Sequence, residues 1–153
     1  QIGETVYDGA VGSAGFLCEA YAWMRGQGEL SAADYEQLQN NTFIGKEKKS
    51  LAYVIGIMNM ILHGVEAPNI VHSNTLAENI TDIQQKDRVD VVLANPPFGA
   101  SIADGVETNF PATYRCKESA DLFVILMLQL LKPKKQLNKK LIEPFLILLI
   151  NQV

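Results

Sequence analysis

One short segment of the sequence combines residue types that are suited to holding a polar ligand. Asn95-Pro96-Pro97-Phe98 directly follows the apolar run Val91-Val92-Leu93-Ala94. Two consecutive prolines fix the backbone and remove two N–H donors, so the nearby carbonyl groups are expected to point outward without partners. An amide side chain, carbonyl oxygens and an aromatic ring would thereby be fixed together. A turn that only ends a strand needs neither the Asn nor the Phe, so this segment predicts a functional site.

Three further segments have weaker but related signals. The turn Asp8-Gly9-Ala10-Val11-Gly12-Ser13-Ala14-Gly15 is made of small residues, which let backbone approach a ligand closely and lead into a helix with free N–H groups. Glu47 follows a β-prone run, where an acidic residue commonly accepts hydrogen bonds from ribose hydroxyls. Ser73-Asn74-Thr75 follows another such run. Each has a structural alternative when it is taken alone: a tight turn, a solvated Glu among lysines and an ordinary loop.

The elements that must position these segments alternate between strand and helix. β-prone runs cover residues 4–7, 42–45, 69–72 and 88–94, and helical periodicity covers 14–25, 31–39, 51–63 and 120–131. Ser31 and Ser119 are predicted as helix N-caps, and residues 99–117 form a long polar loop. This alternation predicts a doubly wound α/β fold with a parallel sheet. Ligands bind such sheets outside the carboxyl ends of the strands, where all four segments fall.

Composition narrows the class of protein. The chain has 153 residues, 48% of them apolar and 20% charged, which predicts one ordinary globular domain. Its apolar runs are far shorter than the roughly 20 residues of a membrane span, and no signal peptide is visible. Cys18 and Cys116 lie far apart and are expected to be reduced thiols in a cytoplasmic protein. His63 and His72 lack partners at metal-ligand spacing, so no metal site is expected.

Basic and acidic residues are distributed unevenly along the chain. Residues 1–131 carry 8 basic and 16 acidic side chains, whereas 132–153 carry 5 basic and 1 acidic. We therefore expect a core over 1–133 and a divergent basic and apolar tail over 134–153, in which 141–150 forms a strand or an apolar helix. A solvated tail explains its lysines better than a nucleic-acid contact does. The sequence opens at Gln1, almost directly on a motif, as expected of a fragment of a larger protein.

These motifs together resemble a known family. Asn95-Pro96-Pro97-Phe98 after an apolar strand, with the Asp8–Phe16 turn upstream, resembles amino-group DNA methyltransferases that use S-adenosylmethionine. More narrowly, Val6–Leu17 and Asn59–Ile70 are similar to the modification (M) subunit of type I restriction–modification systems. The segments 109–112 and 118–123 extend the resemblance, which covers about residues 3–133.

The resemblance implies a Rossmann-like methyltransferase fold with a mostly parallel sheet, incomplete at its C-terminal edge. It also implies a set of cofactor-binding residues, in which Glu47 takes the ribose hydroxyls of S-adenosylmethionine and Asn74 lies near its adenine. The other members of this set, of which the glycine-rich turn lies against the methionine part, are Asp8, Gly12, Ser13, Ala14 and Gly15. The catalytic residues that the resemblance implies are Asn95, Pro96, Pro97 and Phe98.

The implied reaction is methyl transfer to N6 of an adenine flipped out of DNA. The Asn95 side-chain oxygen and the Pro96 carbonyl would accept hydrogen bonds from the amino group, and Phe98 would stack on the base. Direct attack on the methyl group needs neither a metal nor a covalent intermediate. The implied partners are DNA, reached through a complex, and the specificity and restriction subunits of a type I system.

The sequence also departs from the family pattern. Gly9 stands where proline is usual, Asn74 where many members have Asp, and Ala14 where glycine is common; after Pro133 the resemblance stops. Two alternatives therefore stay open. In the first, the methyl acceptor is another planar nitrogen: N4 of cytosine, a nitrogen of an RNA base or the side-chain nitrogen of a protein glutamine. In the second, the chain is an inactive remnant of an M subunit.

Overall fold

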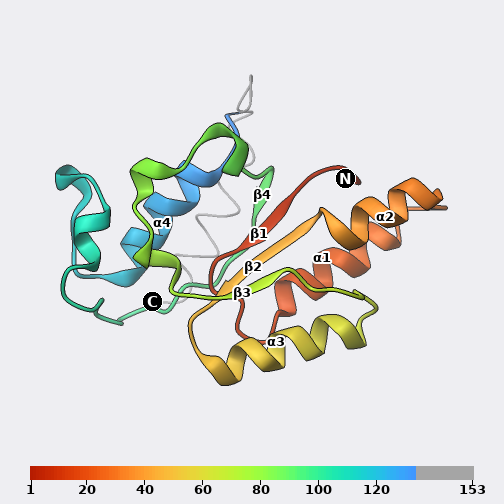
Figure 1. The fold of residues 1–153 in the computed structure, drawn as a ribbon, viewed down its shortest axis with the longest axis horizontal. Coiled ribbons are helices and arrows are strands. Elements are labelled where there is room, and N and C mark those ends of the chain that lie inside the picture. The colour runs from red at the N-terminus through yellow and green to blue at the C-terminus, as the bar shows by residue number, and fades with distance from the viewer. Residues whose placement is uncertain (134–153) are drawn as a thin grey trace.

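A computed structural model describes residues 1–133, which form one parallel sheet with helices on both faces (Figure 1). The strands are β1 (Val6–Asp8), β2 (Phe43–Glu47), β3 (Ile70–His72) and β4 (Val91–Val92). The helices are α1 (Gly15–Arg25), α2 (Ala32–Asn40), α3 (Ser50–Leu62) and α4 (Ser119–Leu130). Short 3-10 turns cover Thr75–Ala77, Ile80–Asp82, Gln85–Asp87, Val106–Asn109 and Ala112–Tyr114.

The sheet has the order β3-β2-β1-β4, and every pairing is parallel. The chain moves outward from β1 through β2 to β3, then crosses to the other side of β1 to form β4. Strand order therefore reverses between β1 and β4, and such a reversal opens a crevice at the carboxyl ends of the strands. The predicted doubly wound α/β fold is confirmed.

Each face of the sheet has its own apolar core. On one face, α1 and α3 pack over the sheet, with Leu17, Tyr21 and Met60 among the buried residues. On the other face, α4 packs with the 3-10 turns after β3, and Leu122 and Phe110 are among the buried residues there. Side chains on both faces exclude water from the sheet, as a parallel sheet requires.

Several local predictions can be compared with the structure. Ser31 caps α2 as expected: its Oγ accepts from the Asp34 N–H at 3.2 Å, and the Ser31 N–H donates to the Asp34 carboxylate at 3.1 Å. The prediction that Ser119 caps α4 is wrong, because Glu118 is the N-cap and Ser119 is the first helical residue. β4 is also shorter than predicted: only Val91–Val92 form the strand, and Val89 makes an isolated parallel bridge with Leu131.

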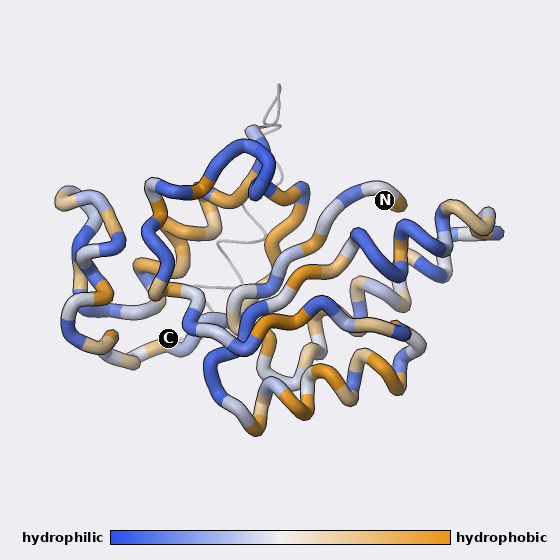
Figure 2. The backbone as a smooth tube through the Cα atoms, viewed as in Figure 1, coloured by the Kyte–Doolittle hydropathy of each residue, from blue (hydrophilic) through white to orange (hydrophobic). Residues whose placement is uncertain are grey.

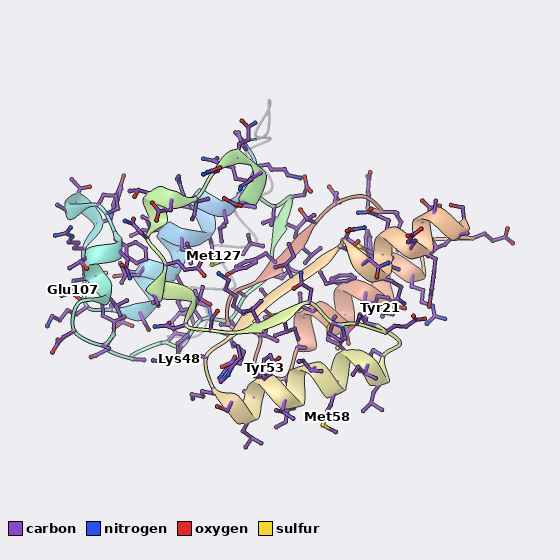
Figure 3. The ribbon with its side chains drawn as sticks, in the orientation of Figure 1. Tyr21, Lys48, Tyr53, Met58, Glu107 and Met127 are labelled. Atoms are coloured by element: carbon purple, nitrogen blue, oxygen red, sulfur yellow. The ribbon has the colours of Figure 1, made fainter. Side chains whose placement is uncertain are left out.

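Helix α3 is apolar on two sides. Gly56 and Met60 are buried against the rest of the fold, whereas Leu51, Met58 and Leu62 are 74%, 56% and 82% exposed on the outer side. Figure 2 shows hydrophobic residues along the length of this helix, and in Figure 3 the Met58 side chain points away from the sheet. None of the helices in residues 1–133 has both the length and the apolar character to cross a membrane. The expected strand or helix at 141–150, and the tail as a whole, lie outside the described residues.

Candidate functional site

The four predicted segments meet at the carboxyl edge of the sheet, around a cavity of about 350 Å³. Gly12, Glu47, Asn74, Asn95 and Pro97, one or two from each segment, all line it. The cavity is within the range of small-molecule and cofactor sites, which is roughly 300–1,000 Å³. The parallel sheet produces this convergence because it brings the carboxyl ends of all its strands to one edge.

The other predicted residues lie near the cavity without lining it. Asp8 and Ala14 are 1% and 0% exposed, and Pro96 is also buried. Ser13 and Gly15 are exposed on the turn, and Phe98 is 43% exposed beyond the two prolines. Phe98 is therefore the residue of the Asn95–Phe98 segment whose large side chain is partly open to solvent.

The turn after β1 is held by three bonds to two other elements, β2 and α3. The Val11 N–H donates to the Lys46 carbonyl of β2 at 3.2 Å, and the Gly12 N–H donates to Glu47 Oε2 at 2.8 Å. Asn59 of α3 donates from Nδ2 to the Ser13 carbonyl at 2.7 Å. The turn thus has a fixed shape even though it consists almost entirely of small residues.

Two backbone features explain the small residues of this turn. Gly12 and Ala14 have φ of 55° and 62°, in the left-handed region that favours glycine. A Cβ added at Gly56 of α3 would lie 3.0 Å from the Gly12 carbonyl oxygen, so a side chain there would push the helix off the turn. Gly9, where the family usually has proline, is held differently: its carbonyl accepts from the Thr75 hydroxyl at 2.5 Å.

Asp8 is a buried carboxylate with one unsatisfied oxygen. Its Oδ1 accepts from the Ala10 N–H at 2.8 Å, whereas Oδ2 has no hydrogen-bond partner among residues 1–133. The pKa of Asp8 is raised from 3.8 to about 7, mainly because burial disfavours the charged form; the Ala10 bond lowers it, and the nearby charge of Glu47 raises it. A cation or a donor placed at Oδ2 would stabilise the charged form.

Glu47 ends β2 and is 9% exposed. Its Oε2 accepts from the Gly12 N–H, and its Oε1 accepts from the Lys49 N–H, both at 2.8 Å. Each carboxylate oxygen has a further lone-pair position, so Glu47 is able to accept from a ligand while it holds the turn. Lys48 and Lys49 also line the cavity, and Figure 3 shows Lys48 where the chain leaves β2 for α3.

Asn74 follows β3 and begins the first 3-10 turn. Its Oδ1 accepts from the Leu76 N–H at 3.3 Å, so its Nδ2 is the group left to face a ligand as a donor. Asn74 and Leu76 both line the cavity, next to Thr75. An amide here presents a hydrogen-bond donor beside an apolar surface, which suits a flat heterocycle with acceptor nitrogens.

The Asn95-Pro96-Pro97-Phe98 segment contributes Asn95 and Pro97 to the cavity lining. Neither the Asn95 side chain nor the Pro96 carbonyl has a hydrogen-bond partner among the described residues. The expectation of unpartnered carbonyls is wrong for Pro97, because its carbonyl accepts from the Ser119 hydroxyl at 2.7 Å. The sequence interpretation treated Ser119 as a helix cap and so missed this bond.

Several cavity residues were not identified from the sequence. The far wall comes from the segment after the Asn-Pro-Pro-Phe motif and from α4, and its apolar members are Ile102, Val106 and Phe123. Isolated apolar residues in a polar loop have no periodicity to mark them. The bond from Asn59 to the turn was missed as well, although Asn59 begins one of the segments on which the resemblance rests.

Several known proteins that this chain resembles in sequence and in structure come from type I restriction systems. The chain is 38% identical to the type I restriction enzyme EcoEI methylase subunit of Escherichia coli over 135 residues, which are 88% of this chain and 27% of that protein. A solved structure described as a modification subunit of a type I restriction enzyme from Vibrio vulnificus YJ016 superposes with a TM-score of 0.82 at 41% identity, over 89% of this chain and 28% of that one. A chain from a type I restriction–modification system, studied for its complex assembly, matches with a TM-score of 0.81 at 43% identity over 88% of this chain and 26% of that one.

The chain therefore spans about a quarter of the length of the relatives it matches. The sequence profile of the N-6 DNA methylase family matches residues 1–137, which include the whole described fold and all four segments of the site. The protein belongs to the N-6 DNA methylase family.

Proposed function

We propose that this chain is the methyl-transfer core of a type I restriction–modification methylase subunit, which transfers a methyl group from S-adenosylmethionine to N6 of adenine in DNA. The observation that carries the proposal is that Asn95 lines the same cavity as Glu47 and Asn74. A hydrogen-bonding group for an amine thus lies beside groups suited to a nucleoside.

The residues around the cavity fit S-adenosylmethionine. Glu47 would accept from the ribose hydroxyls, and Asn74 would donate to the adenine beside Leu76. The unsatisfied Oδ2 of Asp8 suits the methionine ammonium group at the turn, because a positive charge there would compensate the buried carboxylate.

The cofactor supplies an electrophilic methyl group, whose transfer forms an N6–C bond, breaks an S–C bond and releases one proton from the amine. The exocyclic nitrogen of adenine is a poor nucleophile because its lone pair is delocalised into the ring. Asn95 Oδ1 and the Pro96 carbonyl, which have no partner among the described residues, would accept the two amine hydrogens and localise that lone pair. Phe98 would stack on the base once it is flipped from the duplex.

The chain's own residues then contribute positioning and electrostatics, which are large sources of rate acceleration. Recognition of a DNA sequence would come from a specificity subunit and cleavage from a restriction subunit, with which this chain would assemble on DNA. The family match favours a DNA base as the methyl acceptor, so an RNA base or a protein glutamine has no observation in its favour.

Two measurements test the proposal. Isothermal titration of the chain with S-adenosylmethionine is expected to show binding at a single site, and absence of binding would reject the cofactor assignment. Methyl transfer to DNA, measured by mass spectrometry of the nucleosides after mixing with a specificity subunit, is expected to yield N6-methyladenine. Asn95→Ala should abolish that product and leave cofactor affinity within about twofold; a variant that still transfers the methyl group would reject the role of Asn95.

A further inference from the structure

The start of α4 lies beside the Asn95–Phe98 loop and is bonded to it at several points. The Ser119 hydroxyl donates to the Pro97 carbonyl at 2.7 Å, and the Gly99 N–H donates to Glu118 Oε1 at 3.1 Å. Around them, the Ser119 N–H donates to the Ala100 carbonyl at 3.2 Å, and Ser101 forms an antiparallel bridge with Glu118. The loop is therefore joined to a helix that begins 22 residues after Pro97.

The prolines make these bonds important for the loop. Pro96 and Pro97 have no N–H to donate, so only Asn95 and Phe98 carry backbone donors within the loop. The Pro97 carbonyl bonds to Ser119 at the start of α4, and the Gly99 N–H, directly after the loop, bonds to the N-cap residue Glu118. Ser119 is 5% exposed, so water does not compete strongly for its hydroxyl.

The bond to Ser119 also decides which acceptors of the loop stay free. The Pro97 carbonyl is occupied, whereas the Asn95 side chain and the Pro96 carbonyl have no partner among residues 1–133. Ser119 itself lines the cavity together with Asn95 and Pro97. Ser119 thus occupies a lone pair of the Pro97 carbonyl and leaves the Asn95 side chain and the Pro96 carbonyl unoccupied.

We propose that Glu118 and Ser119 are positioning residues, which hold the Asn95–Phe98 loop so that Asn95 Oδ1 and the Pro96 carbonyl face the target amine. This inference rests on the proposed function, since it assigns the geometry of the amine site to two residues that touch the loop. Both act through other residues: Ser119 fixes the peptide after Pro97, and Glu118 fixes the peptide at Gly99.

The test follows the Asn95 side-chain amide by NMR in the 153-residue chain while 9-ethyladenine is added, with and without S-adenosylhomocysteine. Wild type is expected to show shifts of the Asn95 signals. Ser119→Ala should raise the dissociation constant for 9-ethyladenine at least fivefold while its affinity for S-adenosylmethionine stays within twofold. The matched control is Ser31→Ala, which removes a serine hydroxyl from the N-terminus of α2, away from the loop, and should bind 9-ethyladenine as wild type does.

Glu118 is tested by hydrogen exchange at the Gly99 amide. Glu118→Ala removes the acceptor and should speed that exchange at least tenfold, whereas Glu118→Gln keeps an oxygen acceptor and should restore protection to within threefold of wild type. The inference is overturned if wild-type Asn95 does not respond to 9-ethyladenine, if Ser119→Ala binds it as Ser31→Ala does, or if Glu118→Ala leaves Gly99 protected. The two failures can be told apart. If the proposed function is wrong, the chain does not bind S-adenosylmethionine; the titration with 9-ethyladenine is also run without cofactor, so it tests the positioning role independently.

Discussion

The buried carboxyl group of Asp8 should make the stability of the fold depend on pH in an unusual direction. Its pKa is raised from 3.8 to about 7, mainly by desolvation. Between these values the native state holds a proton that the unfolded chain has lost, so the free energy of unfolding falls as the pH rises. At about 1.4 kcal/mol for each factor of ten in the equilibrium, the loss from pH 5 to pH 8 is roughly 2.5 kcal/mol.

Asp8→Asn removes this dependence because asparagine cannot ionise. The asparagine oxygen can still accept from the Ala10 N–H, and its NH₂ group would occupy the position of the unsatisfied Oδ2. If that NH₂ group destabilises the fold, it does so equally at both pH values. It therefore shifts the free energy of unfolding of the variant by a constant and does not change how that free energy depends on pH.

Urea unfolding of wild type and Asp8→Asn at pH 5 and pH 8 measures the effect. The variant should gain about 2.5 kcal/mol relative to wild type over this range. Asp82→Asn, which removes an exposed carboxylate, serves as the control and should follow wild type at both pH values. A difference between Asp8→Asn and wild type that changes by less than about 0.5 kcal/mol would refute the reasoning, since Oδ2 would then be compensated in the folded chain.

Three further outcomes follow from the packing around the site. Gly45→Ala should cost about 1–3 kcal/mol in a thermal melt and weaken S-adenosylmethionine binding, because its Cβ would lie 2.6 Å from a Val11 methyl group that supports the turn; an unchanged melt would contradict this. Met60→Ala should lower the free energy of unfolding by about 2–5 kcal/mol because Met60 is buried, whereas Leu62→Ala, on the exposed side of the same helix, should change it by less than about 0.5 kcal/mol. Equal losses of stability in urea unfolding would show that the buried and exposed faces are misassigned. Glu47→Gln should weaken S-adenosylmethionine binding about tenfold in calorimetry, since a charged acceptor is lost, and unchanged affinity would exclude Glu47 from the ribose site.

The sequence predicted the elements of this fold well because their periodicity is local. Alternating strands and helices implied a parallel sheet, and a parallel sheet gathers its carboxyl ends at one edge, so Glu47, Asn74 and Asn95 could be expected near one another before their geometry was known. The boundaries were less well predicted: residues 88–94 have the β propensity of a long strand, yet only Val91–Val92 pair with β1.

What the sequence could not show were contacts decided by distant packing. A serine at the start of a helix is typical of an N-cap, and nothing local distinguishes a cap from a donor to a carbonyl 22 residues earlier. Likewise, Ile102 and Val106 stand alone in a polar loop, and only the folded chain brings them beside Phe123. The occupied carbonyl of Pro97 and the apolar wall of the cavity therefore had to come from the structure.

The order of strands has a consequence for how the chain folds as it is synthesised. Of the four described strands, β1 is the first to be synthesised, yet it lies inside the sheet, between β2 and β4. Its pairing with β4 joins Val6 to Val91, so one edge of β1 has no strand partner until 85 further residues have been made. Contacts this distant in sequence form slowly. The nascent chain thus carries β1 with one open edge until β4 has been made, and chaperones that bind extended segments would find it there.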